Sequence, residues 1–204
     1  MTEVEFKPFE AFSIRQGAFI SAKSFVYIPG DIYDIKFKGV KEYAAPDNSI
    51  CRYRLRLPTL VLMMDMDEWS DGLRVYSMQT LAIQSTARVE LGCINAMEFV
   101  WWNSSPSAEV CLGKDYLTGK DIGELSHRAA LWYLASTFTN DFGGYLPGAF
   151  WPKELKNVRM ASPYAFMEKW EEMSRDGAIN WDAILKDSQG VQSRKVIYGP
   201  AEVV

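Results

Sequence analysis

Apolar and polar residues alternate in short stretches along the first half of the chain, a period-two pattern that predicts half-buried β-strands. An uninterrupted apolar run at residues 59–64 predicts a central strand, and the acidic stretch at residues 65–71 predicts the hairpin connection after it. The other predicted strands lie in residues 10–23 with a turn at Gly17, in residues 25–37 with a turn at Pro29-Gly30-Asp31, and in residues 52–57, 73–78 and 86–91.

In the second half, from Asp121 onward, apolar residues recur with the three-to-four-residue period of an amphipathic helix. Asp121 and Glu124 resemble a capping box at the start of this helix. We expect the helix to run through Phe138 and a tail at 139–141, and to end at Gly143-Gly144. The apolar positions of the predicted helix are Ile122, Leu125, Ala129, Trp132, Leu134 and Phe138.

A second helix is predicted to begin at Ser162-Pro163, because Pro favours the first helical position, and to end at Gly177. Its predicted buried stripe consists of Phe166, Met167, Trp170 and Met173. A short helix over residues 180–186 is expected to follow, and the last residues of the chain are expected to be frayed or strand-like.

Strands in the first half and helices in the second half predict an α+β fold with an antiparallel sheet. The chain shows no internal repeat, low-complexity tract or domain linker, so we expect a single domain over residues 1–204. We place its core at about residues 50–142, with a strand-rich extension before it and a helical extension after it.

Composition narrows the classes of protein. The net charge is −4 and no basic stripe occurs, which argues against a nucleic-acid-binding protein. The longest apolar run, residues 60–64, is far too short to cross a membrane, and the N-terminus has no apolar stretch typical of a signal peptide. Three cysteines without a Cys-x-x-Cys spacing indicate free thiols in a reducing cytoplasm. With one histidine, we expect no metal site and no cofactor.

The segment that carries candidate chemistry, residues 96–113, lies between the two halves. Its apolar residues 99–102 predict the end of a strand, and a polar loop leads from there to Cys111, shortly before the next helix. A cysteine thiolate is intrinsically nucleophilic and is a good leaving group, so a cysteine in a loop is a candidate acyl carrier.

Ubiquitin-conjugating (E2) enzymes carry a His-Pro-Asn triplet and, eight residues after its Asn, a cysteine in a Gly-x-Ile-Cys-Leu-Asp pattern. Here Asn103 stands eight residues before Cys111, and Val110-Cys111-Leu112 is similar to Ile-Cys-Leu. The sequence departs from that pattern in several places. Trp101 and Trp102 replace His and Pro, Ala108 replaces Gly, Gly113 replaces Asp, and the downstream Trp-Ser-Pro motif is absent.

The chain more closely resembles prokaryotic E2-like proteins, in particular the family D type related to the PRTRC system B protein. This resemblance covers about residues 58–142 and implies a UBC-like fold. The matching pieces, in order, are Pro58-Thr-Leu-Val-Leu, Leu73-Arg-Val-Tyr-Ser, Asn103, Val110-Cys111-Leu112-Gly113 and Ser136-Thr-Phe-Thr139.

The resemblance implies that Cys111 accepts a ubiquitin-like protein as a thioester and passes it to a target amine. It implies that Asn103 stabilises the oxyanion or orders the loop, and Asp141 is a candidate for the acidic residue beside the incoming amine. The implied partners are an E1-like (ThiF-type) activating enzyme, a ubiquitin-like modifier and a protein target. Related operons also encode a JAB-type peptidase and are associated with antiphage defence or plasmid systems.

Alternatives stay open for these residues. We expect Cys51 and Cys93 to be small buried hydrophobes. Asn103 is also suited to capping a turn, and Asp141 to a solvated helix end. His127 lies away from the apolar helix face, which argues against a cysteine hydrolase with a histidine base.

Two other functions also remain open. The first is an inactive E2-like module that only binds a modifier or scaffolds a complex. The second is an unrelated phage or plasmid structural protein in which the motif occurs by chance. The glycine-rich run 143–148 lacks the Gly-Lys-Ser/Thr ending of a phosphate loop, so a nucleotide-binding function has no support there.

Overall fold

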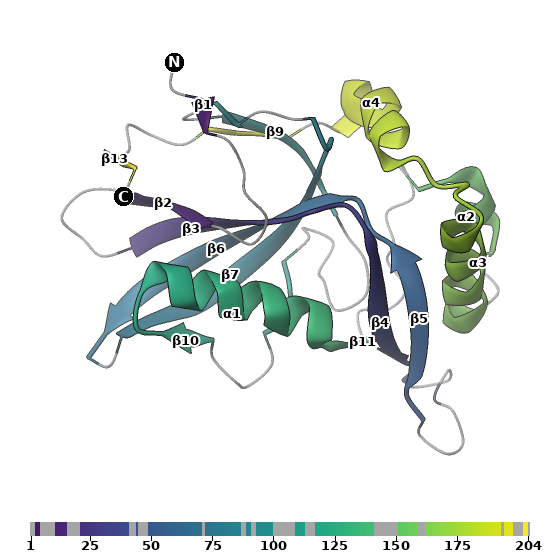
Figure 1. Ribbon diagram of the computed structural model, residues 1–204, viewed down its shortest axis with the longest axis horizontal. Coiled ribbons are helices and arrows are strands. Elements are labelled where there is room, and N and C mark those ends of the chain that lie inside the picture. The colour runs from purple at the N-terminus through teal and green to yellow at the C-terminus, as the bar shows by residue number, and fades with distance from the viewer. Residues whose placement is uncertain are drawn as a thin grey trace.

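A computed structural model of the chain gives a mixed α+β fold (Figure 1). One long helix crosses the face of a curled antiparallel sheet, and the other described helices are grouped on the right of the view. The predicted α+β class and the antiparallel sheet are therefore confirmed. The structure describes residues 3–4, 11–15, 21–40, 44, 49–70, 72–86, 89–90, 93–99, 109–112, 117–140, 151–158, 162–192, 194–197 and 202–203.

The main sheet follows the order β1-β8-β9-β7-β6-β3-β2-β13, with β10 pairing along β7 and β12 along β9. Every pairing in this sheet is antiparallel. Its strands are β1 (Glu3–Val4), β2 (Ala11–Arg15), β3 (Ser21–Ile28), β6 (Thr59–Trp69), β7 (Gly72–Ile83), β8 (Val89–Glu90), β9 (Cys93–Glu98), β10 (Thr118–Gly119), β12 (Arg194–Ile197) and β13 (Glu202–Val203).

A second, smaller sheet contains β4 (Ile32–Lys38), β5 (Cys51–Arg56) and β11 (Thr137–Thr139), in the order β11-β4-β5. The predicted turn at residues 29–31 is confirmed, and it carries the chain from β3 in the main sheet to β4 in the second one. The backbone N–H of Leu57 donates to the carbonyl of Asp31 at 2.9 Å, which fixes the return into β6 beside this turn. The β4–β5 hairpin is thus an insertion between two paired strands of the main sheet.

The helices are α1 (Ile122–Ala135), α2 (Lys153–Val158), α3 (Pro163–Arg175) and α4 (Trp181–Gln192). The predicted starts of α1 and α3 are confirmed, because the side chains of Asp121 and Ser162 accept backbone N–H groups of their first turns. Gly177, with φ of 68°, lies just after α3 as predicted. α4 is longer than the predicted 180–186, and α2 was not predicted.

The predicted length of α1 is wrong. The helix ends at Ala135, and Ser136 has an extended backbone with ψ of 152°. Phe138 is buried in β11, which pairs in parallel with β4, instead of extending the helical stripe. Gly143-Gly144, the predicted end, lies outside the described residues.

The acidic stretch was also assigned wrongly. Residues 65–69 continue β6, and the chain reverses only between Trp69 and Gly72. Met64 and Met66 are fully buried, whereas Asp65 and Asp67 between and after them are partly exposed, so the acidic residues lie on the outer face of a paired strand. Within the predicted strand at residues 86–91, residue 86 lies in a turn and residues 89–90 form β8, whereas residues 87, 88 and 91 and the turn predicted at Gly17 lie outside the described residues.

One face of the main sheet packs against α1, as the ribbon crossing in front of β6 and β7 shows (Figure 1). Leu125, Ala129 and Tyr133 of α1 are buried in the same hydrophobic cluster as the inner residues of β6 and β7. Ser126 is buried as well, and its hydroxyl lies 3.1 Å from the hydroxyl of Ser24 on β3. This hydrogen bond satisfies two polar groups inside the core and fixes α1 on the sheet.

Candidate functional site

The edge of β7 organises the segment that contains Cys111. The backbone N–H of Phe99, just after β9, donates to the carbonyl of Thr80 at 2.9 Å. Glu109 then forms a β-bridge with Gln79, the neighbouring residue of β7. Phe99 and Glu109 are therefore attached at neighbouring positions of β7.

The chain is attached to β7 on both sides of Cys111. Before it, the backbone N–H of Val110 donates to the carbonyl of Met78 at 2.7 Å. After it, the carbonyl of Leu117 accepts from the N–H of Val75 at 2.9 Å, and β10 continues the antiparallel pairing along β7. Cys111 thus lies one residue after Val110 and six residues before Leu117, both of which are bonded to the same strand.

Side chains around Cys111 alternate between solvent and core. Glu109 is exposed, Val110 is only 6% exposed and belongs to the hydrophobic core, and Cys111 is exposed. Leu112 packs against the core again. The buried neighbours hold the backbone in place, while the Cys111 thiol faces solvent, as a nucleophile that meets a protein-sized partner requires.

Gly119 positions α1 directly after this segment. A Cβ added at Gly119 would stand 2.8 Å from the Cβ of Leu125, a separation that real side chains do not adopt. Only a glycine lets β10 approach the first turn of α1 this closely. The small size of Gly119 therefore allows β10 to pack directly against the start of α1.

The outer face of β6 and β7 lies beside Cys111. A β-bulge between Asp65 and Met66 leaves Tyr76 as the extra residue of β7, and its ring is 49% exposed. Burial, and then the carboxylates of Asp65 and Asp67, raise the pKa of Tyr76 above its usual value. The Ser77 hydroxyl donates to the Glu109 carboxylate at 3.4 Å.

Sequence patterns did not single out Tyr76 or Glu109. The available signal for Tyr76 was the spacing of Val75 and Met78. These two apolar residues are three positions apart, yet both are buried on the same face, which requires an inserted residue between them. Glu109 gives no such signal, because its place beside Cys111 depends on its long-range bridge to Gln79.

Two of the three predicted site residues, Asn103 and Asp141, lie outside the described residues. Phe99 and Glu109, on either side of the segment with Asn103, are held at neighbouring positions of β7. Asn140, just before Asp141, is 5% exposed, and its side-chain oxygen accepts from the N–H of Val40 at 2.7 Å.

The other two cysteines differ from Cys111. Cys51 is partly buried on β5, which agrees in part with the expectation of a buried hydrophobe. Cys93 belongs to β9, and its side chain is outside what the structure describes. Among the cysteines whose side chains are described, Cys111 is therefore the exposed one.

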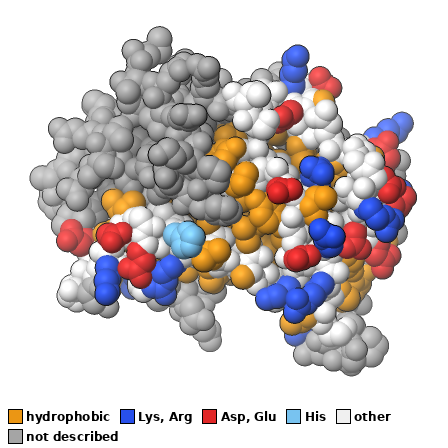
Figure 2. Space-filling view, in the orientation of Figure 1, with side chains coloured by type: hydrophobic (Ala, Val, Ile, Leu, Met, Phe, Trp, Pro, Cys, Tyr) orange, Lys and Arg blue, Asp and Glu red, His pale blue; other side chains and the backbone are white. Residues whose placement is uncertain are grey.

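His127 is exposed on α1, as predicted. Figure 2 shows the histidine side chain, in pale blue, on the surface of the molecule. Among the described residues, no group of three His, Cys, Asp or Glu side chains is arranged to hold a metal ion. None of the described helices is long and apolar enough to span a membrane.

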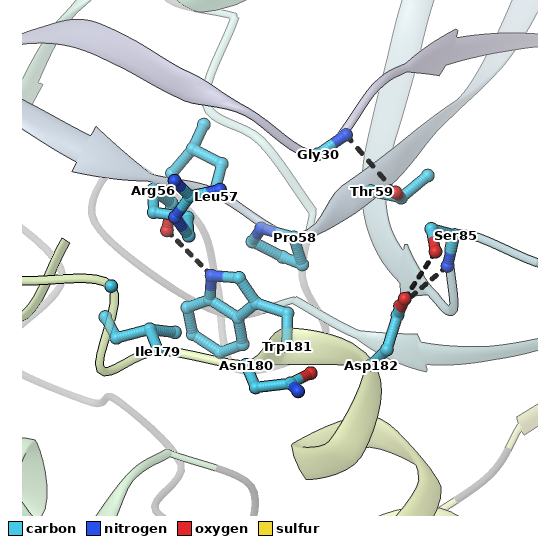
Figure 3. A pocket seen from close by; sticks show the side chains of 11 residues that line it. Gly30, Arg56, Leu57, Pro58, Thr59, Ser85, Ile179, Asn180, Trp181 and Asp182 are labelled. Atoms are coloured by element: carbon cyan, nitrogen blue, oxygen red, sulfur yellow. Dashed lines mark hydrogen bonds between the residues drawn. The ribbon is translucent and has the colours of Figure 1, made fainter.

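A cavity of about 380 Å³ lies at the opposite end of β6, between the turns around Gly30, Pro58 and Ser85 and the start of α4 (Figure 3). The Asp182 carboxylate accepts from the N–H of Ser85 at 2.7 Å and from its hydroxyl. The indole N–H of Trp181 donates to the carbonyl of Arg56 at 2.7 Å. These bonds hold α4 against the sheet, and none of the described residues 109–112 around Cys111 lines the cavity.

We compared the chain with protein-family models, with curated proteins and with solved structures, and none of the three comparisons gave a match. The candidate site therefore stands on its own geometry and on the sequence pattern around Cys111.

Proposed function

We propose that the chain is an E2-like carrier that accepts a ubiquitin-like protein as a thioester on Cys111 and passes it to a target amine. The observation that carries this proposal is the exposure of Cys111 on a backbone held to β7 on both sides, through Val110 and Leu117. A thiol in this setting is open to a large partner and is attached to a rigid element.

The chemistry requires two acyl transfers. The Cys111 thiolate attacks the thioester that joins the modifier's C-terminus to an activating enzyme, a new C–S bond forms, the old C–S bond breaks, and the enzyme's thiolate leaves. A neutral amine of the target then attacks the Cys111 thioester, the C–N bond forms as the C–S bond breaks, and the proton lost by the amine goes to the departing Cys111 thiolate. Both steps pass through a tetrahedral oxyanion, which a nearby N–H donor stabilises.

The order of elements supports a UBC-like arrangement. Strands β2, β3, β6, β7 and β9 run antiparallel as neighbours in chain order, apart from the inserted β4–β5 hairpin and the two-residue strand β8 between β7 and β9. The Cys111 segment follows this meander, and α1 then packs across one face of the sheet. The resemblance in sequence implies the same succession of meander, cysteine loop and helix.

Within this proposal, Asn103 supplies the side-chain N–H donor for the oxyanion, and Asp141 is the acidic residue beside the incoming amine. Support for Asn103 comes from the neighbouring attachment points of Phe99 and Glu109 on β7, since the segment between them starts and ends near Cys111. The role of Asp141 rests on its position in the sequence, after the helix that follows Cys111. The implied partners are a ThiF-type activating enzyme, a ubiquitin-like modifier and a protein target, in a bacterial cytoplasmic pathway connected with antiphage defence.

A charging assay tests the proposal. The chain is incubated with a ThiF-type activating enzyme and a ubiquitin-like modifier, with and without ATP, and analysed on a non-reducing gel. We expect an ATP-dependent adduct that a thiol reductant removes, and the same adduct with the Cys51→Ser variant. A complex with the modifier but no adduct, in the presence of an enzyme that has charged itself, would favour the inactive binding module.

A further inference from the structure

We propose that the outer face of the β6–β7 hairpin beside Cys111 is a docking surface for a lysine-bearing segment of the target protein. This inference rests on the proposed function, since it names the substrate class of the second acyl transfer. The surface consists of Asp65, Asp67, Trp69, Tyr76 and Glu109, and is called the acceptor surface below.

These side chains share one face of the sheet. Met64 and Met66 point into the core, so Asp65, Asp67 and Trp69, which alternate with them on β6, point to the other face. Ser77 is in register with Asp65, and its hydroxyl reaches the Glu109 carboxylate. The acceptor surface therefore runs from the tip of the hairpin to the residue two positions before Cys111.

Two exposed aromatic rings lie on the acceptor surface. Trp69 is 54% exposed and Tyr76 is 49% exposed, which places them among the most exposed large hydrophobic side chains of the described residues. The bulge explains why Tyr76 is exposed, because the extra residue of β7 has no place on the buried inner face of the sheet. Exposed Trp and Tyr rings at this density are typical of surfaces that bind another protein.

The charge on this surface selects the partner. Asp65 and Asp67 lie close enough to Tyr76 for their negative charges to disfavour its ionisation. The guanidinium of Arg74 lies 4.8 Å from the centre of the Trp69 ring, so the same face also carries one positive charge. The carboxylates of Asp65, Asp67 and Glu109 outnumber this guanidinium, and such a surface attracts an ammonium group and repels an acidic segment.

The chemistry of the second acyl transfer explains why the bound segment should carry a lysine. A lysine side chain is an ammonium ion at neutral pH and must lose one proton to solvent before its nitrogen can attack. The nitrogen then forms the amide bond, the C–S bond to Cys111 breaks, and the nitrogen's second proton goes to the departing thiolate. Glu109, exposed on the same side of the chain as Cys111, is the member of the acceptor surface that precedes the thiol by two residues. A positively charged segment bound to the acceptor surface would therefore place its lysine near the Cys111 thioester.

A binding measurement tests the docking surface without any transfer. The probe is a short fluorescein-labelled peptide with one central lysine between arginines and leucines, titrated into the Cys111→Ser protein. We expect Trp69→Ala, Tyr76→Ala and Asp67→Lys each to weaken binding by about five- to tenfold, and salt to weaken it further. Leu131→Ala on α1 and Glu172→Lys on α3 are the matched controls, since both side chains are exposed on other elements.

A transfer measurement then links the surface to the reaction. Cys111 of the wild-type protein is acetylated by exchange with a small acetyl thioester, and its loss is followed by mass spectrometry with the lysine peptide or with hydroxylamine. We expect Tyr76→Ala and Asp67→Lys to slow reaction with the peptide by about five- to tenfold and reaction with the small neutral amine by less than about twofold.

The outcomes separate the two proposals. Equal peptide binding by the wild type, the surface variants and the controls would overturn the acceptor surface, whether or not Cys111 accepts an acyl group. A protein whose Cys111 takes no acyl group, but whose peptide binding depends on Trp69 and Tyr76, would retain the surface and contradict the carrier role. Weakened binding together with selective slowing of the peptide reaction supports both.

Discussion

Gly119 on β10 and Leu125 on α1 are packed so closely that a single methyl group would not fit between them. A Cβ at Gly119 would meet the Cβ of Leu125 at 2.8 Å and its backbone Cα and N at 2.9 Å. Because Leu125 is fully buried and its backbone is helical, the clash cannot be relieved by moving a flexible side chain. This contact joins the end of the Cys111 segment to the long helix.

Substitution of Gly119 by Ala should therefore destabilise the protein. We expect Gly119→Ala to lower the free energy of unfolding by about 1–3 kcal/mol, the usual cost of an overpacked site. Gly123→Ala is the matched control: its added Cβ would stand 3.4 Å from the Asp121 carboxylate, an ordinary contact. That variant should be neutral or more stable by up to about 1 kcal/mol, since Ala favours helices. Urea unfolding of both variants measures the difference, and equal stabilities would contradict the close contact.

The edge of β5 is protected by side chains of α3. The N–H of Arg56 donates to the hydroxyl of Ser174 at 2.8 Å, and the N–H of Arg54 donates to the Glu171 carboxylate at 2.7 Å. Both backbone groups would otherwise be open to pairing with another chain. We expect Ser174→Ala to cost about 1–3 kcal/mol of stability, because Ser174 is 1% exposed and its loss leaves a buried N–H unpaired.

Glu172→Ala is the control for Ser174→Ala. Glu172 is exposed and forms an ion pair with Lys169 at 2.9 Å on the same helix. Its removal should cost at most about 0.5 kcal/mol. Thermal unfolding of the two variants in parallel tests this, and a loss for Ser174→Ala no larger than that for Glu172→Ala would contradict the role given to the hydroxyl.

Trp181 supports the end of the sheet through its ring more than through its hydrogen bond. Its indole N–H donates to the carbonyl of Arg56, which also accepts from Trp170 at 3.2 Å, so one donor remains if the other is removed. We expect Trp181→Phe to cost about 1 kcal/mol and Trp181→Ala about 3–5 kcal/mol. Denaturant unfolding distinguishes the two, and similar losses would show that the hydrogen bond dominates.

Alkaline pH should destabilise the protein through Tyr33. Its hydroxyl donates to the carbonyl of Pro29 at 2.7 Å, and burial, followed by the charge of Asp31, raises its pKa from 10.0 to about 12. The folded state therefore holds the phenolic proton more tightly than the unfolded state. This contribution to stability is complete below pH 10 and is lost as pH rises from about 10 to 12.

Tyr33→Phe removes both the proton and the hydrogen bond. The variant should be less stable than the wild type at neutral pH, and its stability should fall less steeply across the same alkaline range. Urea midpoints measured in steps from neutral to alkaline pH provide the comparison. Parallel curves for the two proteins would contradict the raised pKa.

Local residues in the sequence were sufficient to predict where helices α1 and α3 begin. Asp121 and Ser162 cap their helices through their own side chains, so the residues that decide the structure are adjacent in the chain. The end of α1 depends instead on β4, which is about one hundred residues earlier and takes residues 137–139 as a parallel strand. The helical period wrongly placed Phe138 in the helix, because a single buried apolar residue fits a strand as well as a helix.

The candidate site likewise has features that the sequence predicts and features that depend on long-range contacts. The order of strand, cysteine and helix could be predicted from the sequence. The attachment of Val110 and Leu117 to β7 could not, because these bonds join residues far apart in the chain. The acidic residues of β6 were mistaken for a turn, since an exposed sheet face next to a hairpin has the same polar composition as a turn.

The account depends most directly on Cys111 as the residue that carries the modifier. The decisive measurement compares the wild type with Cys111→Ser in the charging reaction with activating enzyme, modifier and ATP, followed by mass spectrometry of the adduct. We predict a thioester on Cys111 in the wild type and, in the Cys111→Ser variant, an ester on the substituted hydroxyl that survives thiol reductant. An adduct on Cys51 or Cys93, or a reductant-sensitive adduct that persists in Cys111→Ser, would contradict the central claim.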